Sequence, residues 1–178
     1  MVQINVSQQL QEPIGSLRSY GVNEVMNIAG GNSSVQGQIR LMRTDRGILT
    51  RGGLHTEIGL ICSRCLKFFH YPLTLGIEEE YFPITEVTTG ASIPLPDEPG
   101  CFSIDENNIL DLSDAIRQYA LLAFPMKPLC SEDCTGLCST CGCNLNQGHC
   151  NCSSESVDAR LSKLNKLVLA DSQILVNE

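Results

Sequence analysis

The sequence predicts an α+β fold, in which an antiparallel, hairpin-rich and barrel-like β-sheet carries two helices and a C-terminal cysteine module that binds zinc. Three observations lead to this prediction. Apolar residues recur at every second position through residues 35–77, which is the period of a half-buried strand. They recur at helical spacing in residues 112–123 and 157–168. Seven of the ten cysteines lie within residues 129–152.

The sheet is expected to form from short segments of alternating polarity, separated by Gly-, Asp- and Asn-rich turns. Consecutive strands this close in sequence usually pair antiparallel. Residues 8–34 are only weakly patterned, and residues 30–34 (GGNSS) are typical of a loop. The predicted strands are residues 2–6, 35–42, 54–61 and 69–77.

The third and fourth of these strands enclose the sequence Cys62-Ser-Arg-Cys65, which we therefore expect at the tip of a hairpin. Pro72 cannot donate a ladder hydrogen bond, so its strand is predicted to lie at a sheet edge. Residues 83–100 are rich in Pro and Gly and are expected to form a long loop.

Two helices are expected after this loop. Asp111 or Ser113 can cap the first, and Pro125 ends it. The second covers residues 157–168 and carries basic side chains on one face. We expect a sheet domain with an acidic loop and a helix at residues 1–128, and a cysteine-rich zinc module with an amphipathic helix at residues 129–178. The two are predicted to pack as one unit.

The cysteine spacings favour structural zinc, which takes four tetrahedral ligands drawn from short knuckles of two cysteines. Gly142 and Gly148 permit the tight bends that such a cage needs. The spacing predicts one or two zinc ions. One cage consists of Cys138, Cys141, Cys150 and Cys152, and a second consists of Cys62, Cys65, Cys130 and Cys134.

Several alternatives to this partition stay open. A single site could combine Cys62 and Cys65 with two downstream cysteines, and an iron–sulfur cluster also takes four thiolates. A redox dithiol at Cys62 and Cys65 is disfavoured, because its first cysteine would need a helix N-terminus and the flanks are strand-like. Cys101 is interpreted as an inert thiol, whereas Cys143 could replace a neighbouring ligand. His149 is expected at the surface.

The rest of the sequence argues against catalysis. The three histidines lie near no candidate nucleophile, and no glycine-rich phosphate loop is present. A closed cage of four cysteines also leaves no open coordination position for water. We therefore expect a protein that is not an enzyme and has no small-molecule substrate.

The start of the chain has no secretory leader, and no apolar run of about eighteen residues is present. The expected location is the reducing cytoplasm, where stable disulfides are rare; no membrane partner is expected. The net charge of -8 argues against indiscriminate coating of nucleic acid. The charge is segregated, however. Residues 40–77 contain six basic and two acidic residues, whereas residues 78–114 contain ten acidic residues and no Lys or Arg.

Three stretches resemble the YceD family: LICSRCLKFFHYPLTLGIEEEYFP at residues 60–83, LDLSDAIRQYALLAFPMKPLC at residues 110–130 and CTGLCSTCGCNLNQGHCNC at residues 134–152. This bacterial and plastid family is linked to accumulation of the 23S ribosomal RNA of the large subunit. The resemblance implies a non-enzymatic factor of the bacterial cytoplasm that supports 23S rRNA accumulation or large-subunit biogenesis. It also points to Cys62 and Cys65 as the more widely shared pair.

Two functional hypotheses follow. The first is direct contact with ribosomal RNA or its precursor, with Phe68 or Phe69 available for base stacking, although core packing is favoured for Phe69. The second is a protein adaptor whose acidic residues 78–114 hold a basic ribosomal protein or an RNA-processing enzyme. The candidate phosphate-binding residues are Arg40, Arg43, Arg46, Arg51, Arg64 and Lys67.

Overall fold

The computed structural model describes residues 1–96 and 100–152 of the chain. The chain divides into two compact units, Met1–Glu132 and a second unit that begins at Asp133. The first unit contains all of the regular strands and helices of the described residues. That the two units pack as one stays a prediction.

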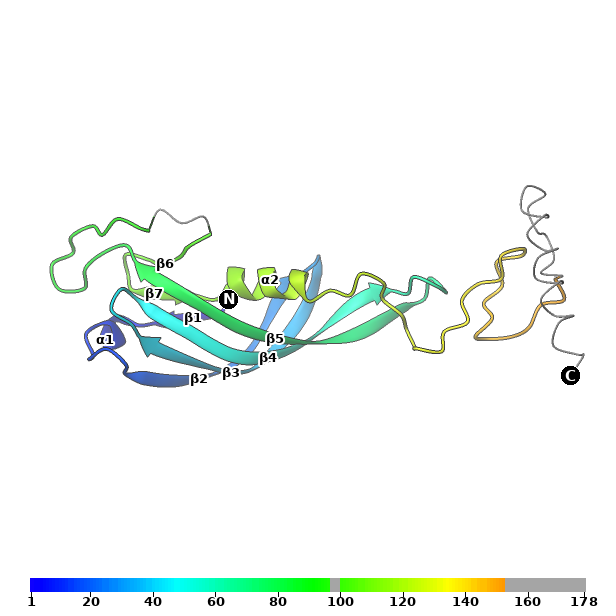
Figure 1. Cartoon of the computed structure of the whole chain (residues 1–178), viewed down its shortest axis with the longest axis horizontal. Helices are drawn as coiled ribbons and strands as arrows, with labels where there is room; N and C mark the ends of the chain where they lie inside the picture. Colours follow the sequence, from blue (N-terminus) through cyan, green and yellow to red (C-terminus); the bar gives the residue numbers. More distant parts are fainter. Residues whose placement is uncertain (97–99, 153–178) are drawn as a thin grey trace, which may run out of the picture. The chain divides into compact units, whose positions relative to one another are not determined.

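The first unit is a seven-stranded sheet that curls into a half-barrel, with strand order β1-β7-β6-β5-β4-β3-β2 (Figure 1). Four long strands, β2 to β5, follow one another as neighbours and make up most of it. The bounds are β1 Gln3–Asn5, β2 Leu17–Ile28, β3 Gly31–Arg43, β4 Ile48–Ile61, β5 Phe68–Pro83, β6 Phe102–Ile104 and β7 Ile109–Asp111.

The sheet is mixed, so the prediction of a purely antiparallel sheet is wrong in one place. β5 and β6 run parallel, with Tyr81 opposite Phe102, whereas all other neighbouring strands are antiparallel. Parallel neighbours need a long crossover connection. The predicted loop after residue 83 supplies this crossover connection, between Pro83 at the end of β5 and Phe102 at the start of β6.

The β2–β3 hairpin corrects a second prediction. Residues 31–34 belong to β3, and the turn is formed by Ala29 and Gly30 alone. Both have a positive φ, 53° and 84°, as a two-residue hairpin turn that matches the strand twist requires. β2 itself was not predicted, because the inward residues Arg18 and Glu24 interrupt its apolar alternation.

The tip of the β4–β5 hairpin lies where the sequence predicts it. Residues 62–67 connect Ile61 at the end of β4 to Phe68 at the start of β5. The edge prediction for Pro72 is wrong for the strand as a whole, because β5 lies between β4 and β6. It holds locally, since β6 pairs only with residues 81–83, and Pro72 has a strand partner on the β4 side alone.

The expected first helix is α2, Ser113–Leu122. It begins where the Asp111 carboxylate accepts a hydrogen bond from the Ser113 N–H at 2.8 Å. Ala115, Ile116 and Ala120 are fully buried on its inner face, and the helix contacts both β5 and β2. A one-turn helix, α1 Ser7–Leu10, was not predicted. The expected helix at residues 157–168 lies outside the described residues.

The core fills the inside of the curl, where Ile39, Leu54 and Leu75 from three neighbouring strands are fully buried. The alternate residues of β2 to β5 face outward and are mostly polar. This arrangement leaves the outer face of the sheet and the hairpin tip accessible to partners. None of the helices in the described part of the chain is long and apolar enough to cross a membrane.

Candidate metal centres

The hairpin tip forms a tight loop, here called the first knuckle (residues 62–67). The Cys62 N–H donates to the Lys67 carbonyl at 2.9 Å, and the Leu66 N–H donates to the Cys62 carbonyl at 3.0 Å. The Arg64 N–H points at the Cys62 Sγ, 3.4 Å away. Leu66 adopts a left-handed conformation with φ of 57°, which is unfavourable for a residue with a Cβ atom.

A second loop of the same design, the second knuckle, covers residues 138–143. The Cys138 N–H donates to the Cys143 carbonyl at 2.9 Å, and the Gly142 N–H donates to the Cys138 carbonyl at 2.9 Å. The Thr140 N–H lies 3.4 Å from the Cys138 Sγ. Gly142 occupies the left-handed position, with φ of 73°. The two C-S-x-C sequences therefore fold into the same backbone arrangement.

Each knuckle belongs to a group of four cysteines whose sulfur atoms all lie within 4.8 Å of one another. The structure brings together the two sets that the spacing predicts. The first tetrad is Cys62, Cys65, Cys130 and Cys134, and the second tetrad is Cys138, Cys141, Cys150 and Cys152. Either group could hold a metal ion.

The first tetrad is well buried, with Cys62, Cys65 and Cys134 only 0%, 6% and 2% exposed. Cys130 comes within reach of the hairpin because the Ser63 N–H donates to the Pro128 carbonyl at 2.8 Å. In the second tetrad Cys141 is exposed and the other three cysteines are half-buried. The two groups therefore share their donor atoms but differ in their protection from solvent.

The sulfur spacing of the first tetrad fits a single tetrahedral ion. Zinc–sulfur bonds of about 2.3 Å place the four sulfurs about 3.8 Å apart, and the Cys65 and Cys130 sulfurs are 3.6 Å apart. An iron–sulfur cluster fits less well, because its iron and sulfide atoms would lie between the cysteines and hold them farther apart. The redox alternative for Cys62 and Cys65 is not favoured either, since strands flank the pair.

Backbone N–H groups favour the thiolate form of the first cysteine in each knuckle. The pKa of Cys62 is lowered to about 6, mainly by the Cys65 N–H and against the effect of burial. The pKa of Cys138 is lowered to about 6 by the N–H groups of Cys141 and Thr140. Because the thiolate is the form that binds metal, these N–H groups favour metal binding at Cys62 and Cys138.

The cysteines outside the tetrads have different surroundings. Cys143 lies beside the second tetrad, where burial and hydrogen bonds to Cys150 and Cys141 raise its pKa to about 11. The Cys101 Sγ lies 3.9 Å from the Pro96 carbonyl oxygen. His149 is exposed, as expected. Among the described residues the groups that could hold a metal include none of these three.

Several of the predicted phosphate-binding arginines have partners within the protein. Arg43 donates to the carbonyls of Leu10, Thr44 and Gly47. Arg46 lies 3.7 Å from Glu80 and over the ring of Phe82. Arg51 pairs with Glu78.

The three remaining basic residues of this set are exposed. Arg40 lies on the outer face of β3, directly opposite Arg51 of β4. Arg64 and Lys67 lie in the first knuckle. RNA binding by any of the six stays a prediction.

The acidic residues of β5 are engaged in the same contacts. Glu78 and Glu80 pair with Arg51 and Arg46 of the neighbouring segment, and Glu79 accepts a hydrogen bond from the Tyr119 hydroxyl at 2.9 Å. The antiparallel register places the basic and acidic segments side by side. This register pairs two of the six basic residues with acidic residues of β5. Arg51 and Glu78 lie the same number of residues before and after the hairpin turn, so the sequence could have predicted that they are opposite each other.

The half-barrel and its two cysteine tetrads define a β-rich protein with candidate structural metal sites. The model of a family described as "Large ribosomal RNA subunit accumulation protein YceD" matches residues 50–168, more than half of the chain. The chain therefore belongs to the YceD family, which confirms the resemblance in the sequence.

Curated relatives of the chain are named only as uncharacterised proteins. Those of Mycobacterium bovis and Mycobacterium tuberculosis are 30% identical over 145 residues, 79% of this chain. A relative from Mycobacterium leprae is 25% identical over 167 residues, 91% of this chain and 71% of that protein. The chain spans 65% of the length of the first two relatives. No solved structure matches the chain.

Proposed function

We propose that this protein is a non-enzymatic, zinc-stabilised factor that supports accumulation of 23S ribosomal RNA, and with it biogenesis of the large ribosomal subunit, in the bacterial cytoplasm. The family assignment supports the ribosomal part of the proposal. The two tetrads support the metal, because four closely spaced sulfurs are the donor set of a structural zinc site. Such a site is closed, so its role is to hold the polypeptide in shape.

The exposed side chains of the hairpin tip carry the proposal of direct RNA contact. Phe68 is 59% exposed, and its ring lies edge-on to His70 with 5.3 Å between centroids. Arg64 and Lys67 are exposed in the adjoining knuckle. An aromatic ring next to cationic side chains is the combination with which proteins bind single-stranded RNA, through base stacking and phosphate contacts.

Gly59 makes room for this arrangement. A Cβ atom at Gly59 would lie 2.5 Å from the Phe68 ring, so a larger residue would displace the ring. The metal ion would contribute by fixing the knuckle that carries Arg64 and Lys67. The hairpin tip would then lose its conformational entropy when the protein folds rather than when RNA binds, which favours RNA binding.

The contacts within the sheet favour the RNA hypothesis over the acidic adaptor. Glu78, Glu79 and Glu80 already have partners within the protein, so a basic partner would have to displace them. We restrict the proposed phosphate contacts to Arg40, Arg64 and Lys67, whose exposed side chains lie on the outer face of β3 and at the hairpin tip. Arg43, Arg46 and Arg51 serve the sheet itself.

The direct test is crosslinking of the protein to RNA in bacterial cells, followed by sequencing of the bound RNA. The proposal predicts reads at discrete positions of 23S rRNA, and loss of most of them in the Arg64→Glu/Lys67→Glu variant. The Arg46→Glu/Arg117→Glu variant changes the net charge equally and serves as the control, because the surface ion pairs that it removes stabilise little. Background recovery from the folded wild-type protein would contradict RNA contact.

A further inference from the structure

The sheet splits between β3 and β4 toward the end that carries the β2–β3 and β4–β5 turns. β3 and β4 pair from Arg43 opposite Ile48 as far as Val35 opposite Thr56, and no farther. Beyond that point β3 continues to Gly31 with β2 alone, and β4 continues to Ile61 with β5 alone. The ends of the two hairpins therefore separate, and each has a strand edge with no strand neighbour among residues 1–96 and 100–152. We call the space between these two edges the fork.

The backbone groups along these edges point into the fork. In an antiparallel ladder, alternate residues turn their N–H and C=O groups to opposite sides. The Cys62 N–H bonds to Lys67 across the β4–β5 hairpin, so Ile61 and Gly59 turn theirs toward β3. Arg43 bonds to residues before β2 through both its N–H and its carbonyl. By the same alternation Asn32 therefore faces β4.

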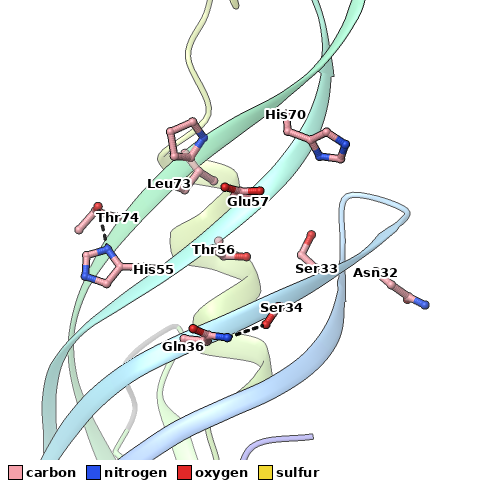
Figure 2. A pocket seen from close by; sticks show the side chains of 11 residues that line it. Asn32, Ser33, Ser34, Gln36, His55, Thr56, Glu57, His70, Leu73 and Thr74 are labelled. Atoms are coloured by element: carbon pink, nitrogen blue, oxygen red, sulfur yellow. Dashed lines mark hydrogen bonds between the residues drawn. The ribbon is translucent and has the colours of Figure 1, made fainter.

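A cavity of about 520 Å³ occupies the fork (Figure 2). Most of its lining residues carry a hydroxyl, amide or imidazole group, and Glu57 is the one carboxylate among them. The Oγ1 atom of Thr56, a residue only 5% exposed, has no hydrogen-bond partner among the described residues. The lining residues are Asn32, Ser33, Ser34, Gln36, His55, Thr56, Glu57, His70, Pro72, Leu73 and Thr74.

We propose that the fork binds an extended segment of a basic partner protein, which adds as a strand to the open edge of β4. Strand addition satisfies the exposed backbone groups of a sheet edge, and adjacent side chains select the sequence. Glu57 would pair with a Lys or Arg of the segment. Ile61, which is 60% exposed and points to the same face as Glu57, would contact an apolar residue farther along.

Charge decides between a protein and an RNA as the occupant. The lining contains a carboxylate and no Lys or Arg, so a phosphate backbone in the fork would meet repulsion without compensation. A basic peptide meets attraction, both from Glu57 and from a chain with a net charge of -8. The fork adjoins the cationic hairpin tip, because His70 lines the cavity and lies edge-on to Phe68, but the lining itself favours a basic peptide.

The test begins with a library of random nine-residue peptides displayed on phage and selected on the full-length protein. The proposal predicts enrichment of peptides that contain Lys or Arg, and at least a tenfold weaker binding by Glu57→Lys. Glu106→Lys is the matched control, because Glu106 is exposed in the β6–β7 turn and should leave binding unchanged. Absence of enrichment, or equal binding by both variants, would contradict the proposal.

Synthetic versions of an enriched peptide test the backbone contacts. N-methylation of alternate amides removes N–H donors without changing the side chains. Methylation of the amides that face β4 should weaken binding about tenfold, the effect of losing about two hydrogen bonds. Methylation of the other amides should change the affinity little. Equal affinities would contradict strand addition. A labelled uridine decamer that binds Glu57→Lys much more tightly than it binds wild type and Glu106→Lys would show that the fork takes RNA instead. Unchanged 23S crosslinking by Glu57→Lys would keep the two proposals separate.

Discussion

The first and second knuckles have the same three backbone interactions but differ in burial and at three of their six positions. Cys62 and Cys65, at the tip of the β4–β5 hairpin, are buried, whereas Cys141 is exposed and Cys138 is half-buried. The left-handed position is Leu66 in the first knuckle and Gly142 in the second. The C-S-x-C sequence thus determines the loop locally, whereas its surroundings determine how much of the fold depends on it.

The largest expected difference between the two knuckles concerns stability. Cys65→Ser should remove the metal from a buried site at the tip of the two longest strands, and lower the free energy of unfolding by more than about 4 kcal/mol, as the loss of a structural metal typically does. Cys141→Ser should change the unfolding of the sheet by about 0.5 kcal/mol or less. Denaturant unfolding followed by far-ultraviolet circular dichroism measures both. Equal losses would show that burial does not separate the sites.

The two knuckles should behave alike toward pH. The pKa values of Cys62 and Cys138 are both lowered to about 6, below the ordinary thiol value of about 8.5. The stability that these thiolates contribute is therefore fully present above the ordinary value, and it is lost as the pH falls through about 6.

Thiolate absorbance of the metal-free protein measures this titration. The thiols of Cys62 and Cys138 should titrate near pH 6, and the corresponding absorbance change should be lost in Cys62→Ser and in Cys138→Ser. If every thiol titrated near its ordinary pKa, the backbone N–H groups would not act on the sulfurs as inferred.

Exchanging the left-handed residues should have a smaller effect than removing the buried metal site. A Cβ atom at Gly142 meets nothing within 4 Å, so Gly142→Leu should cost only the backbone strain, about 1–2 kcal/mol. Leu66→Gly relieves the same strain but gives the unfolded chain more freedom, so a gain of no more than about 1 kcal/mol is expected. Chemical unfolding of the zinc-loaded variants measures both changes. Destabilisation by Leu66→Gly would mean that the exposed leucine side chain stabilises the fold.

Sequence patterns predicted the features that are determined locally. The alternation of residues 35–77 located three of the long strands, and the cysteine spacing grouped the tetrads. Features that depend on distant segments were missed. The parallel pairing of β5 with β6 depends on the path of a long loop, and β2 is hidden by Arg18 and Glu24 on its inner face. The fork could not be foreseen, because it depends on where pairing between β3 and β4 stops.

Metal stoichiometry tests whether the two knuckles, alike in backbone, build two separate metal sites. Zinc would be counted per chain by mass spectrometry in the wild-type protein, in Cys62→Ser/Cys65→Ser and in Cys138→Ser/Cys141→Ser. The account predicts two ions in the wild-type protein and one in each variant. A single ion in the wild-type protein that both variants lose would show that the knuckles share one site, and would contradict the account.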